Sequence, residues 1–302
     1  MSPAAPSPHP SLATSLLPDA VERLAASVVG LSLRRGAASG VVWQSGVVVT
    51  AASSVWRASR LPIVLPNGEQ VDGTLRGVDA STDLAAVAFE GAEVPPVERS
   101  TAAPSRSGDF VFAVGREPSG LVQASFGHVG AVAGEWRSWR GGRVERLIRL
   151  DGGLYPGLAG AAVADASGQA IGIASAAFSR MHGVVLPAET ISRVLAQLLS
   201  HGRVQQGYLG IAAQPVRAML DGAGVEGLLV SSVADDAPAA LAGLLVGDVI
   251  VEAGGRPVAN IEDLRALLGE QVGGQLTLKL ARGGQAQSLA IDVAERPMRH
   301  CH

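Results

Sequence analysis

Residues 150–163 read LDGGLYPGLAGAAV, and residues 168–176 follow as GQAIGIASA. The order of residue types predicts a strand, a Pro-Gly turn, a tight loop of small residues, and a hairpin that ends in a Gly-Ile strand. A tight loop of this kind can present a nucleophilic side chain. Its central residue here is Ala159, so the stretch that indicates the fold also raises the question of whether the protein is an enzyme.

The pattern of short strands extends outward from this loop. Apolar or alternating runs recur from Val28 to about Leu186, and Gly, Pro and the pair Asn67-Gly68 supply turns between them. The clearest runs are VVGLSLR, SGVVWQ, GVVVTAA, DLAAVAFE, DFVFAVG and LVQASFGHVGAV. Strands at this regular spacing predict a barrel or a sandwich rather than repeated strand-helix-strand units.

Segments of other kinds flank these strands. Residues 1–17 are rich in Pro, Ser and Ala and predict a flexible arm, after which a short helix is expected to start near Asp19. The run LPAETISRVLAQLLSHG has apolar residues at helical spacing and predicts a helix that ends at Gly202. After Gly207, strands alternate with the helical runs DDAPAALAGL and IEDLRALLGEQ, which predicts a second, smaller α/β domain.

The composition argues against nucleic-acid-binding and membrane-spanning proteins. The chain has 302 residues, of which 47% are hydrophobic, and 24 basic against 27 acidic residues give a net charge of −3. No basic stripe is present, and no apolar run is long enough to span a membrane. A single cysteine, Cys301, cannot form an intramolecular disulfide. The first residues lack the parts of a signal peptide, so a cytoplasmic location is expected, or a periplasmic one if a leader is missing.

Five stretches form a recognisable series along the chain. They are VVVTAASSV at 47–55, VDASTDLAAV at 78–87, GDFVFAVGREPSGL at 108–121, LDGGLYPGLAGAAV at 150–163 and DDAPAALAGLLVGDVIVEAGGRPV at 235–258. The series resembles the motifs of the HtrA/DegP family of serine proteases, in which a trypsin-like double β-barrel precedes a PDZ domain. The resemblance implies a mainly β chain, with the double β-barrel over residues 18–202, a small α/β PDZ domain over 203–297, and a tail at 298–302.

The resemblance carries the catalytic positions over one by one. The family's aspartate matches Asp83, its histidine position falls on Ser53, and its serine position falls on Ala159. A methyl group cannot attack a carbonyl carbon, and a serine hydroxyl is too weak a base to replace an imidazole. Two of the three catalytic groups of the family are therefore missing from this sequence.

The loop around Ala159 departs from the family in a further way. Gly157 and Leu158 begin what remains of the oxyanion loop, and Ala161 stands in place of a glycine. Because a residue with a Cβ resists positive φ, the loop is expected to be distorted at that position. The nearest histidine, His128, is placed by the resemblance on a different strand turn and is not expected to act as the base.

The stretch GYLGI, residues 207–211, resembles the carboxylate-binding loop of PDZ domains. Consecutive backbone N–H groups can converge there on a C-terminal carboxylate, and the peptide then adds as an edge strand. The residues expected to bind the peptide are Tyr208, Leu209, Gly210, Ile211, Leu264 and Leu268. No charged side chain lines this pocket, so the expected ligands are protein or peptide C-termini with an apolar last residue.

These observations favour a non-catalytic HtrA-like homologue that acts as a peptide-binding scaffold, a chaperone-like module or a regulatory partner of an active relative. The alternative is an active serine endopeptidase in protein quality control that uses a non-standard catalytic arrangement. The resemblance also implies assembly as a homotrimer through the N-terminal part of the first domain. No cofactor is expected, and the tail residues His300, Cys301 and His302 offer metal ligands but no fourth member of a tetrahedral site.

Overall fold

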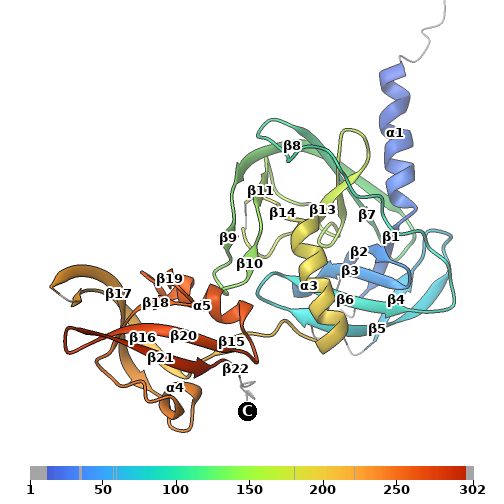
Figure 1. The fold of residues 1–302 in the computed structure, drawn as a ribbon. Coiled ribbons are helices and arrows are strands. Elements are labelled where there is room, and N and C mark those ends of the chain that lie inside the picture. The colour runs from blue at the N-terminus through green and yellow to red at the C-terminus, as the bar shows by residue number, and fades with distance from the viewer. Residues whose placement is uncertain are drawn as a thin grey trace, which may run out of the picture. The chain divides into compact units, whose positions relative to one another are not determined.

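The computed structural model describes residues 12–33, 36–56, 58, 60–179, 181–220 and 222–296. The tail with His300, Cys301 and His302 lies outside these residues, and so do residues 1–11 of the expected arm. The chain divides into two compact units between Val204 and Gln205, and Figure 1 shows the strands and helices of each.

The first barrel of the N-terminal unit closes through six antiparallel strands in the order β1-β2-β3-β6-β5-β4. The strands are β1 (Val28–Ser32), β2 (Ala37–Gln44), β3 (Val47–Ala51), β4 (Leu61–Val64), β5 (Gln70–Asp79) and β6 (Leu84–Phe89). The predicted Asn67-Gly68 turn connects β4 to β5, with Gly68 at a φ of 85°. The short helix α2 (Ala52–Val55) follows β3 directly and carries Ser53.

The second barrel has the strand order β11-β14-β13-β12-β7-β8. Its strands are β7 (Phe110–Arg116), β8 (Val122–Ala133), β11 (Leu147–Leu150), β12 (Ala162–Asp165), β13 (Ala170–Ser175) and β14 (Val184–Pro187). A small two-stranded ribbon, β9 (Trp136–Arg137) and β10 (Arg143–Val144), lies in the connection from β8 to β11. The two closed barrels confirm the double β-barrel that the resemblance implies.

The two long helices of this unit differ in how well the sequence predicts them. Helix α3 (Ala188–His201) ends at Gly202, which adopts a φ of 72° as a left-handed cap, as predicted. Helix α1 (Leu12–Ala25) begins at Leu12 rather than near Asp19, so the prediction of a flexible arm as far as residue 17 is wrong. The run LATSLL contains the good helix formers Leu and Ala, and Pro18 lies inside the helix, where it removes one backbone N–H donor.

The largest apolar cluster joins both barrels to the two helices. It contains Leu24 of α1, Trp43 of β2, Phe112 of β7 and Leu195 of α3. Burying each large apolar side chain contributes about 1.5–3 kcal/mol relative to exposure. Because the members come from all four parts, their burial fixes the barrels against each other and positions the loops that meet between them.

The C-terminal unit is a five-strand path of antiparallel sheet with two helices and a short accessory ribbon. The sheet has the order β16-β17-β18-β20-β21, with β19 beside β18, and β15 pairs with β22. Its strands are β15 (Gly207–Tyr208), β16 (Ile211–Leu220), β17 (Ala223–Val233), β18 (Val249–Ala253), β19 (Arg256–Pro257), β20 (Gln275–Arg282), β21 (Gln285–Asp292) and β22 (Ala294–Glu295). Helix α4 spans Pro238–Leu241, and α5 (Ile261–Glu270) starts in a capping box made by Asn260 and Asp263.

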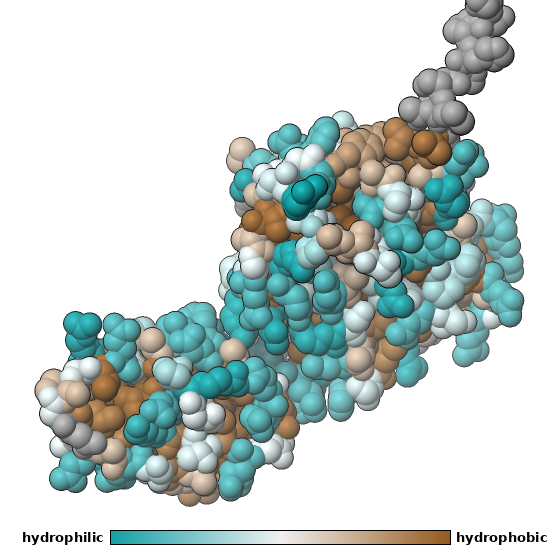
Figure 2. Space-filling view, turned by 45° about the horizontal axis from the view of Figure 1, so that its top comes forward, coloured by the Kyte–Doolittle hydropathy of each residue, from teal (hydrophilic) through white to brown (hydrophobic). Residues whose placement is uncertain are grey.

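Polar and apolar residues are mixed over the surface of both units, and the visible face of the C-terminal unit carries a group of apolar residues (Figure 2). The exposed large apolar side chains of that unit are Met219, Leu241, Leu245 and Val246. Among the described residues, no helix combines the length and the hydropathy needed to cross a membrane.

Candidate functional site

Asp83 lies immediately before β6 and is 2% exposed. Its φ of 58° places it in the left-handed region, which is uncommon for a residue with a side chain. Its carboxylate accepts hydrogen bonds from the Ser53 N–H, 2.7 Å from Oδ1, and from the Ser175 hydroxyl, 2.5 Å from Oδ2. The structure therefore brings Ser53 and Asp83 together and adds Ser175, a residue that the sequence analysis missed.

The charge state of Asp83 is set mainly by burial. Burial raises the pKa of the Asp83 carboxyl, and the hydrogen bonds from Ser175 and Ser53, together with the positive charge of Arg140, lower it by a smaller amount. These hydrogen bonds and the charge of Arg140 therefore compensate a negative charge on this carboxyl only in part. The group as it stands braces the turn before β6 against α2 and β13.

Because burial raises the pKa of Asp83, Asp83→Asn is predicted to stabilise the protein relative to the wild type at higher pH. An amide keeps both contacts, since its oxygen accepts from Ser53 and its nitrogen donates to Ser175. The pKa of this carboxyl in the folded state lies above its ordinary value of 3.8. Its contribution to the free energy of unfolding is therefore fully present below pH 3.8 and is lost as the pH rises through the folded-state pKa. In urea denaturation, the Asn variant should match the wild type near about pH 4 and exceed its free energy of unfolding near about pH 8.

Asp83→Ala is the matched control, because it removes both contacts and leaves buried donors unpaired. It should lower the free energy of unfolding by about 2 kcal/mol near about pH 4, and by less near about pH 8, where the wild type itself has lost the contribution of this carboxyl. An Asn variant that is less stable than the wild type by more than about 1 kcal/mol at the higher pH would show that the ionised carboxylate is favourable in the fold.

The loop around Ala159 is held by backbone contacts with β2 and β13. The Ser39 N–H donates to the Ala159 carbonyl at 3.1 Å, and the Gly160 N–H donates to the Ala174 carbonyl at 2.8 Å. The buried hydroxyl of Ser39 donates to the Gly157 carbonyl at 2.8 Å. Ser39 was also missed from the sequence, because it lies 118 residues from Gly157 along the chain.

The replacement of a glycine by Ala161 does not distort this loop in the way the sequence suggested. Among the described residues, only Asp83 and Asp236 combine a side chain with a positive φ, so the expectation of backbone strain at Ala161 is wrong. Positive φ falls on Gly157, at 89°, and on Gly160, at 80°. Both are glycines, so the loop reaches its turn without a penalty.

The loop also lies close to the other two positions of interest. A Cβ on Gly160 would come within 2.5 Å of Thr50 Oγ1 and 3.0 Å of the Ala51 nitrogen, and α2 with Ser53 begins at the next residue after Ala51. The N–H groups of Gly157 and Ala159 donate to no residue within the described part of the chain. The fold thus brings the loop around Ala159 close to the start of α2 and leaves two N–H groups there without an acceptor among the described residues.

A buried arginine ties this region to α1. Arg116, at the end of β7, is 7% exposed and donates to the carbonyls of Val28 at 2.8 Å, Gly120 at 3.0 Å and Ala25 at 2.9 Å. Its own N–H donates to the hydroxyl of Ser39 at 3.0 Å. Burial lowers the pKa of the guanidinium, which remains protonated near neutral pH. The end of α1 and the Gly157 loop therefore share one hydrogen-bond network.

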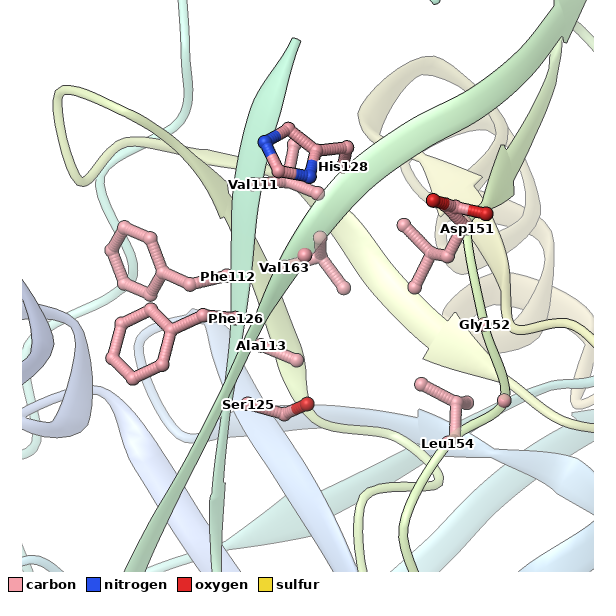
Figure 3. Close-up of a pocket in the computed structure, with 13 residues that line it drawn as sticks. Val111, Phe112, Ala113, Ser125, Phe126, His128, Asp151, Gly152, Leu154 and Val163 are labelled. Carbon is pink, nitrogen blue, oxygen red and sulfur yellow. The ribbon is translucent and has the colours of Figure 1, made fainter. Parts of the chain in front are cut away.

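A small pocket near β8 is lined in part by His128 and Asp151 (Figure 3). The pocket is lined by β7, β8 and the segment after β11, and Asp151 lies on that segment. The His128 ring contacts Phe110, with the ring centres 5.8 Å apart. No side-chain hydrogen bond joins His128 to another described residue. His128 therefore sits in the second barrel, apart from the Ser53–Asp83 pair.

The loop at residues 207–211 in the C-terminal unit has a sharp turn at Gly210. Gly210 has a φ of 80°, and a Cβ on it would lie 2.2 Å from the Ala237 Cβ. The carbonyls of Leu209 and Gly210 accept hydrogen bonds from Ala239 at 3.0 Å and Ala234 at 2.7 Å. Within the described residues, the N–H groups of Leu209 and Gly210 have no backbone acceptor. These donors are available to an incoming carboxylate.

The strand that follows this loop, β16, is at an edge of the sheet and pairs with β17 alone. Ile211 at its start is half-buried, and Tyr208 lies in β15. Leu264 and Leu268 of α5 are 1% and 5% exposed and belong to the core of the unit. The structure therefore places the last two beneath the expected groove rather than open to solvent.

Comparisons with known proteins match both units. Residues 38–173 match the family model of the trypsin-like peptidase domain, and residues 207–293 match that of the PDZ domain. A relative named "Probable periplasmic serine endoprotease DegP-like" from Brucella suis biovar 1 is 32% identical over 269 residues, which cover 85% of this chain and 52% of the relative. The chain spans about half the length of the curated relatives it matches.

Two solved structures are similar over nearly the whole chain. The serine endoprotease from Yersinia pestis has a TM-score of 0.76 at 25% identity, covering 96% of this chain and 100% of that one. The structure named "HtrA-type protease AlgW with tripeptide" has a TM-score of 0.75 at 26% identity, covering 93% of this chain and 97% of that one.

Proposed function

The chain belongs to the HtrA type of trypsin-like peptidases with a PDZ domain, and on this premise we propose that it is a non-catalytic member that binds polypeptides. The observation that carries the proposal is the contrast between its two sites. Ser53 and Ala159 stand where the chemistry needs an imidazole and a nucleophile. The PDZ loop keeps the turn at Gly210 and two N–H groups without backbone acceptors.

An active serine endopeptidase is the second candidate. The relatives are named as serine endoproteases, and Asp83 is held by two hydrogen bonds in the position next to Ser53. Labelling with an active-site fluorophosphonate, combined with casein turnover, distinguishes the two candidates. The proposal expects neither signal above background, and labelling that a single serine substitution abolishes would overturn it.

The proposed ligands are protein or peptide C-termini with an apolar last residue. The carboxylate would accept from the N–H groups of residues 209–211, and the peptide would pair with the free edge of β16. Ile211 supplies half-buried apolar surface, and Leu264 and Leu268 lie in the core beneath it. None of the three carries a charge, so a charged terminal side chain would be buried without a partner. The module would act as a scaffold, as a chaperone-like binder, or as a partner of an active relative.

A free C-terminus is expected to be essential for this binding. A labelled peptide with an apolar last residue should bind with a Kd of micromolar order, and its amidated copy should bind at least about tenfold more weakly. Gly210→Val should weaken binding because its side chain would collide with Ala237. Gly224→Val is the control, since no atom lies within 4 Å of the added Cβ. Equal affinity for the two peptides would contradict recognition of C-termini.

The buried position of Leu264 rules out one tempting variant. Leu264→Asp would place a charge in the core at a site that is 1% exposed and would unfold the unit rather than report on the groove. The amidated peptide is therefore the main readout.

We propose that the protein assembles as a homotrimer through α1 and the neighbouring strands, or that it assembles with an active relative. Light scattering of the purified protein tests the oligomeric state. We also extend to this chain the periplasmic location in the relatives' names, and cell fractionation tests it.

A further inference from the structure

The connection between β8 and β11 contains a hydrogen-bonded turn, residues 137–143, which we name the Trp-Arg turn. The Ser138 N–H donates to the Gly142 carbonyl at 2.8 Å, and the β9–β10 ribbon closes the base of the turn. The Ser138 side chain is buried and donates to the Ser81 carbonyl at 2.5 Å. A Cβ on Gly142 would lie 2.4 Å from Ser81, so the turn packs directly against the segment that leads to Asp83.

The Trp-Arg turn presents an aromatic side chain to solvent. Trp139 is 73% exposed, and the guanidinium of Arg140 stacks over its ring at 4.4 Å. Arg140 also donates to the Ala80 carbonyl at 3.4 Å. Tryptophan and arginine are the side chains that most often dominate binding energy at interfaces, and a preformed turn loses little entropy on binding.

The charges of the turn are only partly compensated. Arg143 pairs with Glu135 at 3.0 Å, and Glu145 behind the turn is held by Arg193 at 2.6 Å. Arg137 and Arg140 form no ion pair with any residue in the described ranges; their hydrogen bonds go to the carbonyls of Gly141 and Ala80. Two cations without an ion pair among the described residues therefore flank an exposed tryptophan, although the charge of Arg140 also acts on the buried carboxyl of Asp83, in a chain whose net charge is −3.

We propose that the Trp-Arg turn is a docking site for an extended polypeptide segment that carries acidic side chains. Carboxylates would pair with Arg137 and Arg140, and an apolar side chain or the backbone of the segment would pack on the indole of Trp139. Two cations neutralise too few phosphates to hold a nucleic acid at physiological salt, which favours a peptide. This site lies in the peptidase-like unit and goes beyond the proposed function of the PDZ domain.

The test uses the full chain and a fluorescein-labelled peptide of alternating Glu and Leu with both termini blocked. Blocked termini exclude capture of a C-terminus by the PDZ loop, so failure here is distinguishable from failure there. Trp139→Ala should weaken binding at least about tenfold, and Arg140→Gln about threefold to tenfold. Leu121→Ala and Arg106→Gln, at sites 59% and 86% exposed, should bind like the wild type.

A second peptide with Gln in place of Glu checks the role of charge, and it should bind at least about fivefold more weakly at low salt. Because Trp139 and Arg140 are exposed, melting temperatures of the variants should equal that of the wild type, and a variant that melts early is replaced by Trp139→Lys. Three outcomes would each overturn the proposal. The first is an unchanged affinity of the Trp139 variant, and the second is equal binding of the Gln and Glu peptides. The third is a single-stranded oligonucleotide that binds more tightly and displaces the Glu peptide.

Discussion

The double variant Ser53→His, Ala159→Ser is expected to react with a fluorophosphonate and to cleave casein, whereas the wild type and each single variant stay at background. A serine without a base and a histidine without a nucleophile each lack a partner, and the members of a triad act as one unit worth about 10⁶ in kcat. The gain should therefore appear only when both substitutions are combined.

The expectation rests on how the structure holds Asp83. The Ser53 N–H that bonds Oδ1 belongs to the backbone and is retained by a histidine at that position. Oδ2 accepts one hydrogen bond from Ser175 and keeps a second lone pair for an imidazole N–H. An adjacent imidazolium would also favour the ionised carboxylate, which burial alone disfavours. The unpaired N–H groups of Gly157 and Ala159 are the remaining donors for an oxyanion.

Asp83→Asn in the double variant supplies the control. Loss of the carboxylate in a serine-protease triad costs about 10⁴ in kcat, so labelling of this triple variant should fall close to background. A double variant that folds with an unchanged melting temperature and remains unlabelled would show that more than two side chains separate this site from a working one.

Arg116→Met is expected to destabilise the N-terminal unit by about 3 kcal/mol or more, because three carbonyls lose a buried donor at about 1–3 kcal/mol each. Removal of a charge that burial disfavours offsets part of this loss. For a unit of this size the melting temperature should fall by about 6–12 °C. Differential scanning calorimetry measures both quantities.

Arg106→Met is the matched control for this substitution. Arg106 is 86% exposed and its contact with Asp109 is 3.7 Å long, so its replacement should change the free energy of unfolding by less than about 0.5 kcal/mol. Amide hydrogen exchange adds a local readout, since the Arg116 variant should lose protection at the end of α1, where the side chain donates to Ala25. The Gly157 loop should keep its protection, because the Arg116 backbone N–H still donates to Ser39; equal loss in both regions would contradict this division.

The sequence predicted the elements whose signals are local. The alternating strands, the Asn67-Gly68 turn and the Gly202 helix end follow from periodicity and turn chemistry, and each is confirmed. The start of α1 was predicted wrongly. Pro18 and the Pro-rich segment before the helix argue against a helix when the sequence alone is considered, and they outweighed the helix propensity of the neighbouring residues. The exposure of Leu264 could not be read from α5 alone, since it depends on which side of the helix the sheet covers.

The sequence by itself determined which chemical groups stand at each position of the site: a serine at 53, an aspartate at 83 and an alanine at 159. Only the tertiary structure decided what those groups contact. Ser175 reaches Asp83 across 92 residues of chain, and Ser39 reaches Gly157 across 118. Such pairs leave no local pattern, because any buried polar atom must find a partner and strand pairing selects which one is near. The buried position of Arg116 and the exposed one of Trp139 have the same origin: each was set by the packing of segments distant in sequence.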